Sequence, residues 1–151
     1  MKIEDEIKST IPINIAKKVL LNVTFTKNVI SDKFQEIMKP YDLSSEQYNV
    51  LRILRGQKGT PANMCVIQDR MISKSSNTTR LIDKLLIKEM VTRKECPDNR
   101  RKVEILITAK GLEILQKLDH LVIEYEEKFA SNLTNIELEN LNFLLEKYRT
   151  I

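Results

Sequence analysis

The chain has 151 residues, of which 42% are hydrophobic and 30% are charged. This length and composition suit one globular domain with a proper core. No apolar run approaches the roughly 20 residues that a membrane span needs, and the charged N-terminus lacks the apolar segment of a secretory signal. We therefore expect a cytoplasmic protein with no membrane partner, and its two cysteines do not suggest a disulfide-stapled secreted domain.

The net charge of +4 is distributed unevenly along the chain. Residues 1–50 are balanced, residues 51–110 carry a net +8 (14 basic against 6 acidic side chains), and residues 111–151 carry −4 (4 against 8). A concentrated basic region is typical of a surface that binds a polyanion such as nucleic acid. The middle third is therefore the expected binding region.

The first patterned segment runs from about residue 12 to 38. Its apolar residues recur mostly at helical spacing, Pro12 suits a first helical turn, and Pro40 ends the pattern. The run VLLNVTF is β-branched enough to suit a strand as well. Its surroundings are too long and unbroken for one strand, so we expect a helix over 12–38.

Two shorter helices are expected next. The first lies in LSSEQYNVLRILRGQKG and closes at Gly56 and Gly59. The second lies in TPANMCVIQDRM, where Thr60 suits an N-cap and Pro61 suits the first helical position. The short link ISKS joins it to the stretch that follows, which predicts a helix-turn-helix.

Residues 75–88 form the stretch around which the chain is organised. Drawn as a helix from Ser75, one arc is apolar except for one threonine and consists of Thr78, Leu81, Ile82, Leu85 and Leu86. The opposite arc is polar and cationic and consists of Ser76, Asn77, Thr79, Arg80, Asp83 and Lys84, extended by Lys88. Hydroxyls and amides reach phosphates and base edges, and arginine can grip guanine. This predicts a DNA recognition helix, although an ordinary amphipathic helix with a solvated basic face would show the same pattern.

After this helix the period changes to that of a β-hairpin over about 90–108. A strand at 90–96 is followed by the turn formers Pro97, Asp98 and Asn99 and by an alternating strand at 102–108. Three cations lie at or next to the turn, namely Arg100, Arg101 and Lys102. A cationic hairpin tip suits a DNA minor groove, where width and negative potential attract arginine. The alternative is a merely solvated turn.

The C-terminal residues 109–149 predict a long helix capped by Thr108 and a last helix that starts with a capping box of Thr134 and Glu137. Both carry long apolar stripes, as does the N-terminal helix. Such a surplus of apolar surface favours burial against a second copy, and a two-fold homodimer would present two recognition helices to neighbouring half-sites. The alternative is that the terminal helices pack on each other within one chain.

Residues 43–111 resemble the MarR family of bacterial winged helix-turn-helix regulators. The likeness is carried by LSSEQYNVLRIL, by SNTTRLIDKLLIKEMV and by CPDNRRKVEILITAKG, and the flanking helices fit the same layout. It implies a mostly α fold: one MarR-like domain over 1–151, with a winged helix-turn-helix at 43–108, a two-stranded β wing, and long N- and C-terminal dimerisation helices. It also implies a homodimeric, duplex-DNA-binding repressor (sometimes an activator) whose affinity is often lowered by a small-molecule effector or by thiol oxidation.

Carried over by position, the resemblance assigns DNA contacts to both elements. The major-groove face would consist of Ser75, Ser76, Asn77, Thr79, Arg80 and Lys84. Arg101 would be the wing arginine in the minor groove, with Arg100 beside it and Lys102 completing the basic tip. This chain departs from the family at Asn99, where Asp is usual, and at Glu89, where Gly is usual after the recognition helix. The turn at Glu89 must therefore be made without the residue that most easily adopts a left-handed conformation.

The residues that enzymes use are scarce in this sequence. It has a single histidine, His120, three glycines and no metal-ligand spacing, so we expect no enzyme activity, no cofactor and no metal. Cys96 has basic neighbours that can lower a thiol pKa, whereas Cys65 is expected to be packed. A thiol-based redox regulator using Cys96 or Cys65 and a winged-helix protein-interaction module without DNA binding remain the alternatives.

Overall fold

The computed structural model describes residues 2–74, 77–96 and 99–150, and for residue 96 and residues 99–102 it describes the backbone alone. The chain consists of two compact units, Met1–Ser45 and Glu46–Ile151. The described residues are mostly helical with one two-stranded antiparallel sheet, which confirms the expected fold class. Over the same residues, no helix combines the length and the apolar character that crossing a bilayer takes. The organisation of the whole chain as a single MarR-like domain stays a prediction.

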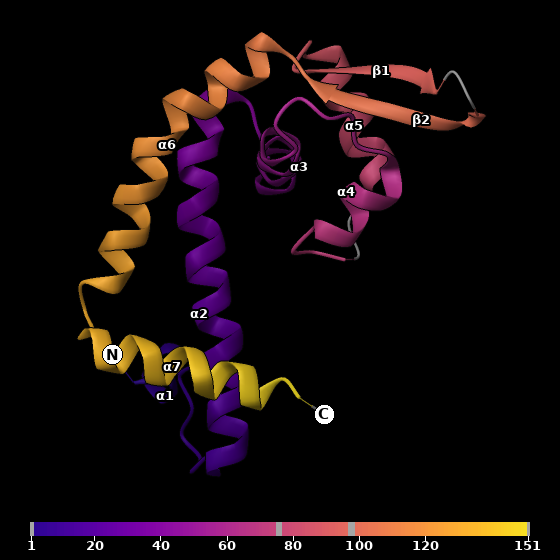
Figure 1. Ribbon diagram of the computed structural model, residues 1–151. Coiled ribbons are helices and arrows are strands. Elements are labelled where there is room, and N and C mark those ends of the chain that lie inside the picture. Colours follow the sequence, from indigo (N-terminus) through magenta and orange to yellow (C-terminus); the bar gives the residue numbers. More distant parts are fainter. Residues whose placement is uncertain (1, 75–76, 97–98, 151) are drawn as a thin grey trace. The chain divides into compact units, whose positions relative to one another are not determined.

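The N-terminal unit is built on one long helix, α2 (Ile15–Met38), so the strand alternative is wrong. A short helix, α1 (Ile3–Glu6), precedes it and a 3-10 turn (Lys39–Tyr41) follows it (Figure 1). The expected start at Pro12 is wrong, because Asn14 is the N-cap and its side-chain oxygen accepts a backbone N–H at 2.9 Å. The end at Met38 agrees with the prediction.

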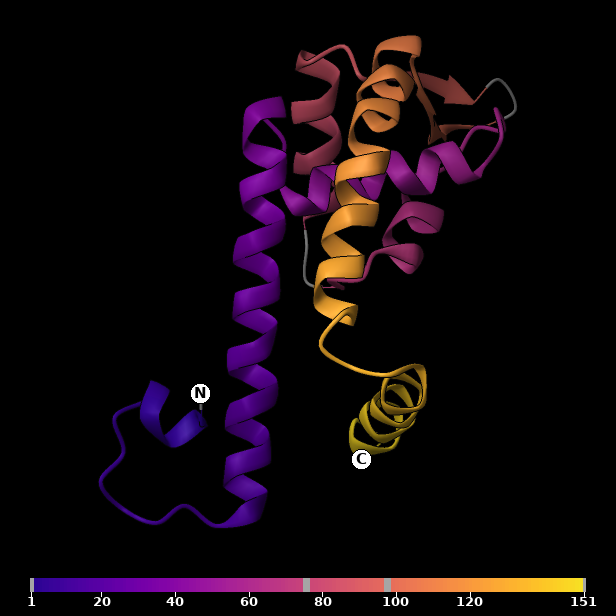
Figure 2. The same cartoon turned by 90° about the vertical axis from the view of Figure 1, so that its left-hand side faces the viewer.

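The second unit contains the predicted helix-turn-helix and wing. Helices α3 (Ser45–Gly56), α4 (Met64–Arg70) and α5 (Thr78–Ile87) precede the hairpin of β1 (Val91–Cys96) and β2 (Asn99–Ile107). Two helices follow, α6 (Ala109–Ala130) and α7 (Asn135–Tyr148). Figures 1 and 2 show α6 leading away from the hairpin and α7 as a separate helix at its far end.

Helix α4 starts later than the sequence predicts. Thr60 and Pro61 do not open it; Asn63 is the N-cap, and its side-chain oxygen accepts the Val66 N–H at 3.0 Å. Ala62 is unavailable to a helix because it pairs with Ile105 of β2, through N–H to carbonyl hydrogen bonds of 3.0 and 2.8 Å. The base of the wing is thereby joined to the segment that enters α4.

The core of the second unit takes side chains from its elements up to α6. The most deeply buried are aliphatic and come from α3, α4, α5, β2 and α6: Val50, Leu51, Ile67, Ile82, Leu85, Ile105, Leu115 and Leu118. Burying such a side chain contributes about 1.5–3 kcal/mol. The helix-turn-helix and the hairpin therefore share one core and form a platform for the outward-facing surface of α5.

The hairpin has a regular register near its base. Val91 pairs with Ile107 and Glu95 with Val103, and the register then shifts so that Cys96 pairs with Asn99. Strand β2 begins at Asn99 and not at residue 102, because Asn99, predicted to lie in the turn, pairs with Cys96.

Candidate nucleic-acid interface

Helix α5 carries the polar surface that was predicted to read DNA. It begins at Thr78, and not at Ser75, because Asn77 is its N-cap: the side-chain oxygen of Asn77 accepts the backbone N–H of Arg80 at 3.1 Å. The predicted apolar arc faces inward, with its members buried or half-buried: Thr78, Leu81, Ile82, Leu85 and Leu86. The helix is thus anchored by one face.

The opposite face of α5 is open to solvent. Five of its described members are exposed, namely Asn77, Thr79, Arg80, Asp83 and Lys84, whereas Lys88, which was predicted to extend this face, is half-buried. Ser75 and Ser76 lie outside the described residues. The oxygen of Asn77 is already engaged in capping the helix, so its amide nitrogen is the group left to donate to DNA. The described part of this surface therefore offers one amide, one hydroxyl and two cations, beside the carboxylate of Asp83.

Asp83 is the one acidic side chain on this surface, and it has a partner from the wing. The carboxylate of Asp83 lies 3.5 Å from a guanidinium nitrogen of Arg93 in β1. A carboxylate facing phosphates would repel them, and the neighbouring cation offsets that charge. Sequence reasoning missed the role of Arg93. The packing of β1 against α5 determines which cation lies beside Asp83, and the sequence pattern does not show that packing.

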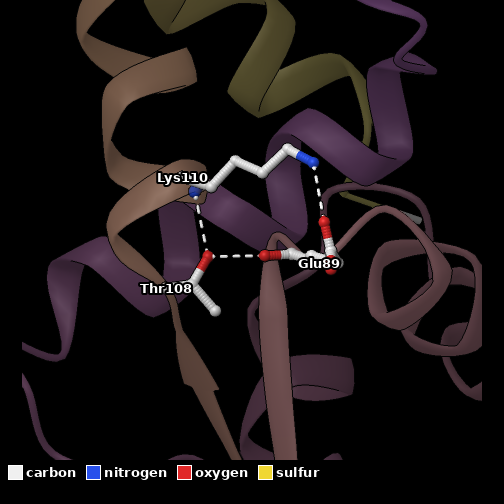
Figure 3. A network of polar contacts seen from close by, with 4 residues as sticks. Glu89, Thr108 and Lys110 are labelled. Carbon is white, nitrogen blue, oxygen red and sulfur yellow. Dashed lines mark hydrogen bonds and ion pairs between the residues drawn. The ribbon is translucent and has the colours of Figure 1, made fainter.

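The junction after α5 is closed by polar contacts (Figure 3). Glu89 adopts φ of +58°, so the turn is made by a non-glycine residue, as the departure from the family pattern predicts. The Thr108 hydroxyl donates to the Glu89 carbonyl at 2.8 Å, and the Lys110 ammonium lies 3.2 Å from the Glu89 carboxylate. The same hydroxyl oxygen accepts the Gly111 N–H at 3.1 Å, which confirms Thr108 as the N-cap of α6.

Gly111 explains why the family-like motif ends in glycine. A Cβ atom at this position would lie 2.5 Å from the carbonyl oxygen of Met90 and 2.8 Å from Cγ1 of Ile107. Met90 follows the α5 junction, and its carbonyl also accepts the Thr108 N–H at 3.0 Å. The motif therefore brings the start of α6 against the base of the wing.

The basic tip of the hairpin lies largely outside the described residues. This holds for Pro97 and Asp98 and for the side chains of Cys96, Asn99, Arg100, Arg101 and Lys102. The pairing of the two strands places the backbone of residues 99–102 at the distal end of the hairpin. Their DNA contacts stay predictions.

The remaining candidate groups offer little chemistry. Cys65 is exposed on α4, so the expectation that it is packed is wrong, and it borders a surface cavity of about 410 Å³ between α4 and the start of α5. His120 is exposed on α6. Among the described residues, no three His, Cys, Asp or Glu side chains gather in a way that could hold a metal ion.

A second charged cluster ties α3 to α6, away from the outer face of α5. Both terminal nitrogens of Arg55 lie 2.9 Å from the carboxylate oxygens of Asp119. This hydrogen bonding raises the pKa of Arg55, and burial raises the pKa of nearby Tyr48. The bidentate pair fixes the orientation of α6 on the helix-turn-helix.

Comparison with known proteins agrees with this arrangement. The MarR family profile matches residues 43–103. The crystal structure of a MarR transcription factor from Planctomyces limnophilus is 32% identical, with 90% of this chain and 98% of that chain covered and a TM-score of 0.70. This chain belongs to the MarR family. Members of the family are DNA-binding transcription regulators, and the chain is accordingly a regulator and not an enzyme.

Two further proteins extend the comparison for this MarR-family chain. An uncharacterised HTH-type transcriptional regulator, YpoP of Bacillus subtilis, is 29% identical over 133 residues, which cover 88% of this chain and 87% of the relative. The structure of the Staphylococcus aureus MepR–DNA complex matches with a TM-score of 0.77 and 18% identity, over 91% of this chain and 97% of that chain. At that identity the second match speaks for the fold alone.

Proposed function

We propose that this MarR-family regulator is a homodimeric repressor that reads a two-fold-symmetric DNA site through α5. The observation that carries the proposal is the division of α5 into a buried apolar face and an exposed face of hydroxyl, amide and cationic groups. The related fold of MepR was determined with DNA bound, which is consistent with this use of the scaffold.

The base-reading contacts are assigned to the outer face of α5. Arg80 is the candidate for a bidentate contact to guanine, and Lys84 and the hydroxyl of Thr79 are suited to phosphates or base edges. The amide nitrogen of Asn77 can donate at the helix start. Ser75 and Ser76 complete the proposed major-groove set, and Arg100, Arg101 and Lys102 on the wing are assigned to the minor groove.

The proposed dimer is supported by apolar side chains that the chain leaves exposed. On α7 they recur along most of the helix and comprise Ile136, Leu141, Phe143, Leu144, Leu145 and Tyr148. A contiguous apolar surface of this kind is typical of an interface, and a second copy of the chain is the occupant that the family resemblance implies. Two copies would present two α5 helices to half-sites about one helical turn apart. A small-molecule effector that lowers DNA affinity completes the proposal.

The proposal is tested by selecting DNA from a random duplex pool at two salt concentrations. The protein is purified and its mass in solution is measured beforehand. We expect a two-fold-symmetric site bound by a dimer, with affinity that falls steeply with salt because each neutralised phosphate releases counterions. Binding without sequence preference, or by a single chain, would contradict the proposal. The selected site then allows effectors to be screened and the direction of regulation to be measured with a reporter.

A further inference from the structure

One side chain of α4 makes hydrogen bonds both to Lys74 and to the first residue of α5. The side-chain nitrogen of Gln68 donates to the carbonyl of Lys74 at 2.9 Å, and its side-chain oxygen accepts a hydrogen bond from the hydroxyl of Thr78. Lys74 precedes the helix start and Thr78 is the first residue of α5. One amide therefore connects both sides of the entry to the proposed recognition helix.

We propose that Gln68 is a positioning residue for DNA reading, which acts through Thr78 to set the orientation of α5. The inference rests on the proposed function of α5, since it concerns how that helix is aimed. Gln68 itself needs no contact with DNA for this role.

The burial of Thr78 explains why its hydroxyl needs Gln68. Thr78 is only 5% exposed, and a buried hydroxyl without a partner loses the hydrogen bonds it would make in water. Methionine at position 68 would keep the length of the side chain but would leave this hydroxyl unpaired. The hydrogen bond therefore favours one placement of the first residue of α5 over others.

Placing Thr78 also places the groups proposed to touch DNA. Thr78 lies between Asn77 and Thr79 in the chain, and Arg80 follows within the same turn. Because the backbone of a helix is regular over one turn, fixing its first residue, together with the buried Ile82 and Leu85, restricts the direction in which these side chains project. Hydrogen bonds to base edges depend strongly on distance and angle, so a small rotation of α5 would weaken them.

Lys74 makes a second contact with α4. The Lys74 ammonium donates to the carbonyl of Asp69 near the end of α4. The backbone and the side chain of Lys74 are therefore both bound to α4, the first through Gln68 and the second directly. The link ISKS lacks the glycine often found in the family, and the contacts with α4 are made at Lys74.

The test compares Gln68→Met with a matched change, Gln116→Met, on the exposed surface of α6. Affinities are measured for the selected operator and for random duplex, at a temperature where circular dichroism shows each full-length variant to be folded. We expect Gln68→Met to lower operator affinity about tenfold, the order of one or two lost hydrogen bonds, with little change on random duplex. Gln116→Met should change neither affinity. An unchanged ratio of operator to random-duplex affinity in Gln68→Met would overturn the proposal.

A double-mutant cycle with Thr78 separates positioning from a general loss of stability. Thr78→Val removes the hydroxyl at nearly the same shape, whereas Thr78→Ser keeps it. We expect Thr78→Val to lower operator affinity and to add little to Gln68→Met, and Thr78→Ser to bind like the parent. Fully additive effects, or equal binding by the valine and serine variants, would overturn the proposal. If Gln68→Met fails to fold, the comparison of Thr78→Val with Thr78→Ser still tests the positioning role.

Arg80→Ala, measured in the same series, distinguishes the positioning role of Gln68 from the proposed reading of DNA by α5. If Arg80→Ala loses operator preference and Gln68→Met keeps it, the positioning role is wrong and the proposed function stands. If the parent protein shows no preference for any duplex, the proposed function fails and the positioning role fails with it. Loss of preference in both variants, with binding to random duplex retained, is the expected result.

Discussion

Helices α5 and α7 are both rich in apolar residues but have different surroundings. The apolar residues are strongly segregated to one face on α5 and weakly on α7, and both helices begin at a side-chain N-cap. The apolar face of α5 is covered by its own chain, with Leu85 0% exposed, whereas on α7 Leu145 is 39% and Phe143 60% exposed. An apolar stripe therefore predicts that a surface is to be covered, and does not say which molecule covers it.

The two helices also differ in how their ends are held. The start of α5 is tied to α4 through Gln68, and its junction with β1 is tied to the cap of α6 through Glu89 and Thr108. The start of α7 is held by a local capping box between Thr134 and Glu137. The start of α5 is therefore fixed by contacts with other elements, whereas the start of α7 is fixed by its own residues alone among the contacts described.

The largest expected effect comes from the buried face of α5. Leu85→Ala should lower the free energy of unfolding by about 2–5 kcal/mol, because the removed atoms leave a cavity in a packed core. Leu145→Asp on α7 should instead leave the helical content unchanged and reduce the mass in solution to that of one chain. Its melting temperature should also become independent of protein concentration. Urea unfolding and light scattering measure the two effects.

The control for the added charge in this comparison is Asn140→Asp, at an exposed position of the same helix. It should keep the dimer mass. A dimer retained by Leu145→Asp would show that the α7 surface is covered in some other way, and the contrast with α5 would then be lost.

The contacts that hold the far end of α5 can be broken at Gly111. Gly111→Ala should destabilise the protein by roughly 1–3 kcal/mol, since the added methyl group would overlap the carbonyl of Met90. Gly56→Ala is the matched control, because a Cβ atom there meets no heavy atom within 4 Å. Thermal unfolding of both variants checks the prediction, and equal melting temperatures would contradict it.

The outer face of α5 is tested at Arg80. Arg80→Ala should weaken operator binding by about 1–3 kcal/mol and relax base preference at one position in each half-site. Lys117→Ala, which removes one positive charge from the exposed surface of α6, controls for net charge. The measurement is repeated DNA selection with each variant. If the Arg80 variant keeps the parental preference, Arg80 does not read bases directly.

A smaller effect, of opposite sign, is expected at the turn that follows α5. Glu89→Gly should raise the free energy of unfolding by about 1 kcal/mol, because the left-handed conformation costs a residue with a Cβ atom that much. Glu89→Ala also loses the carboxylate that meets Lys110 but keeps the Cβ atom, so it should show no such gain. Denaturant unfolding of both variants separates conformational strain from the ion pair.

The smallest effect concerns the cap of α7 and depends on pH. The backbone N–H and the hydroxyl of Thr134 donate to the Glu137 carboxylate and lower its pKa below 4.5. A lowered pKa means that this stabilisation is complete above the ordinary value and is lost as the pH falls through the folded value. Amide NMR signals of α7 should therefore change in acid, and Glu137→Gln should remove that dependence. Glu139→Gln on the same helix should preserve it.

The periodicity of the sequence predicted the helices and their faces well. The polar residues of the outer arc that the structure describes are exposed from Asn77 to Lys84, and only Lys88, which extends the arc, is half-buried, because helical spacing largely determines which side chains share a face. Helix starts were predicted less well, since three helices begin at an asparagine cap further along the chain: Asn14, Asn63 and Asn77. Several residues near each start could serve as a cap. Tertiary pairing, such as that of Ala62 with Ile105, selects among them.

Contacts between elements were not predictable from the pattern. Gln68 and Arg93 look like ordinary surface residues in the sequence, and their partners Thr78 and Asp83 lie on a neighbouring helix. The exposure of Cys65 was missed for the same reason. Their environments depend on how α4, α5 and β1 pack together, which no local spacing encodes.

The pairing of Ala62 with Ile105 also bears on folding and opening. These two hydrogen bonds join positions far apart in the chain, and α4, α5 and β1 all lie within the loop that they close. Closing a long loop is slow, because chain entropy is lost before the enclosed contacts form. We expect the amides of Ala62 and Ile105 to exchange with deuterium only on global unfolding of this unit. The segment before α4 would then stay paired with the base of β2 until the unit unfolds.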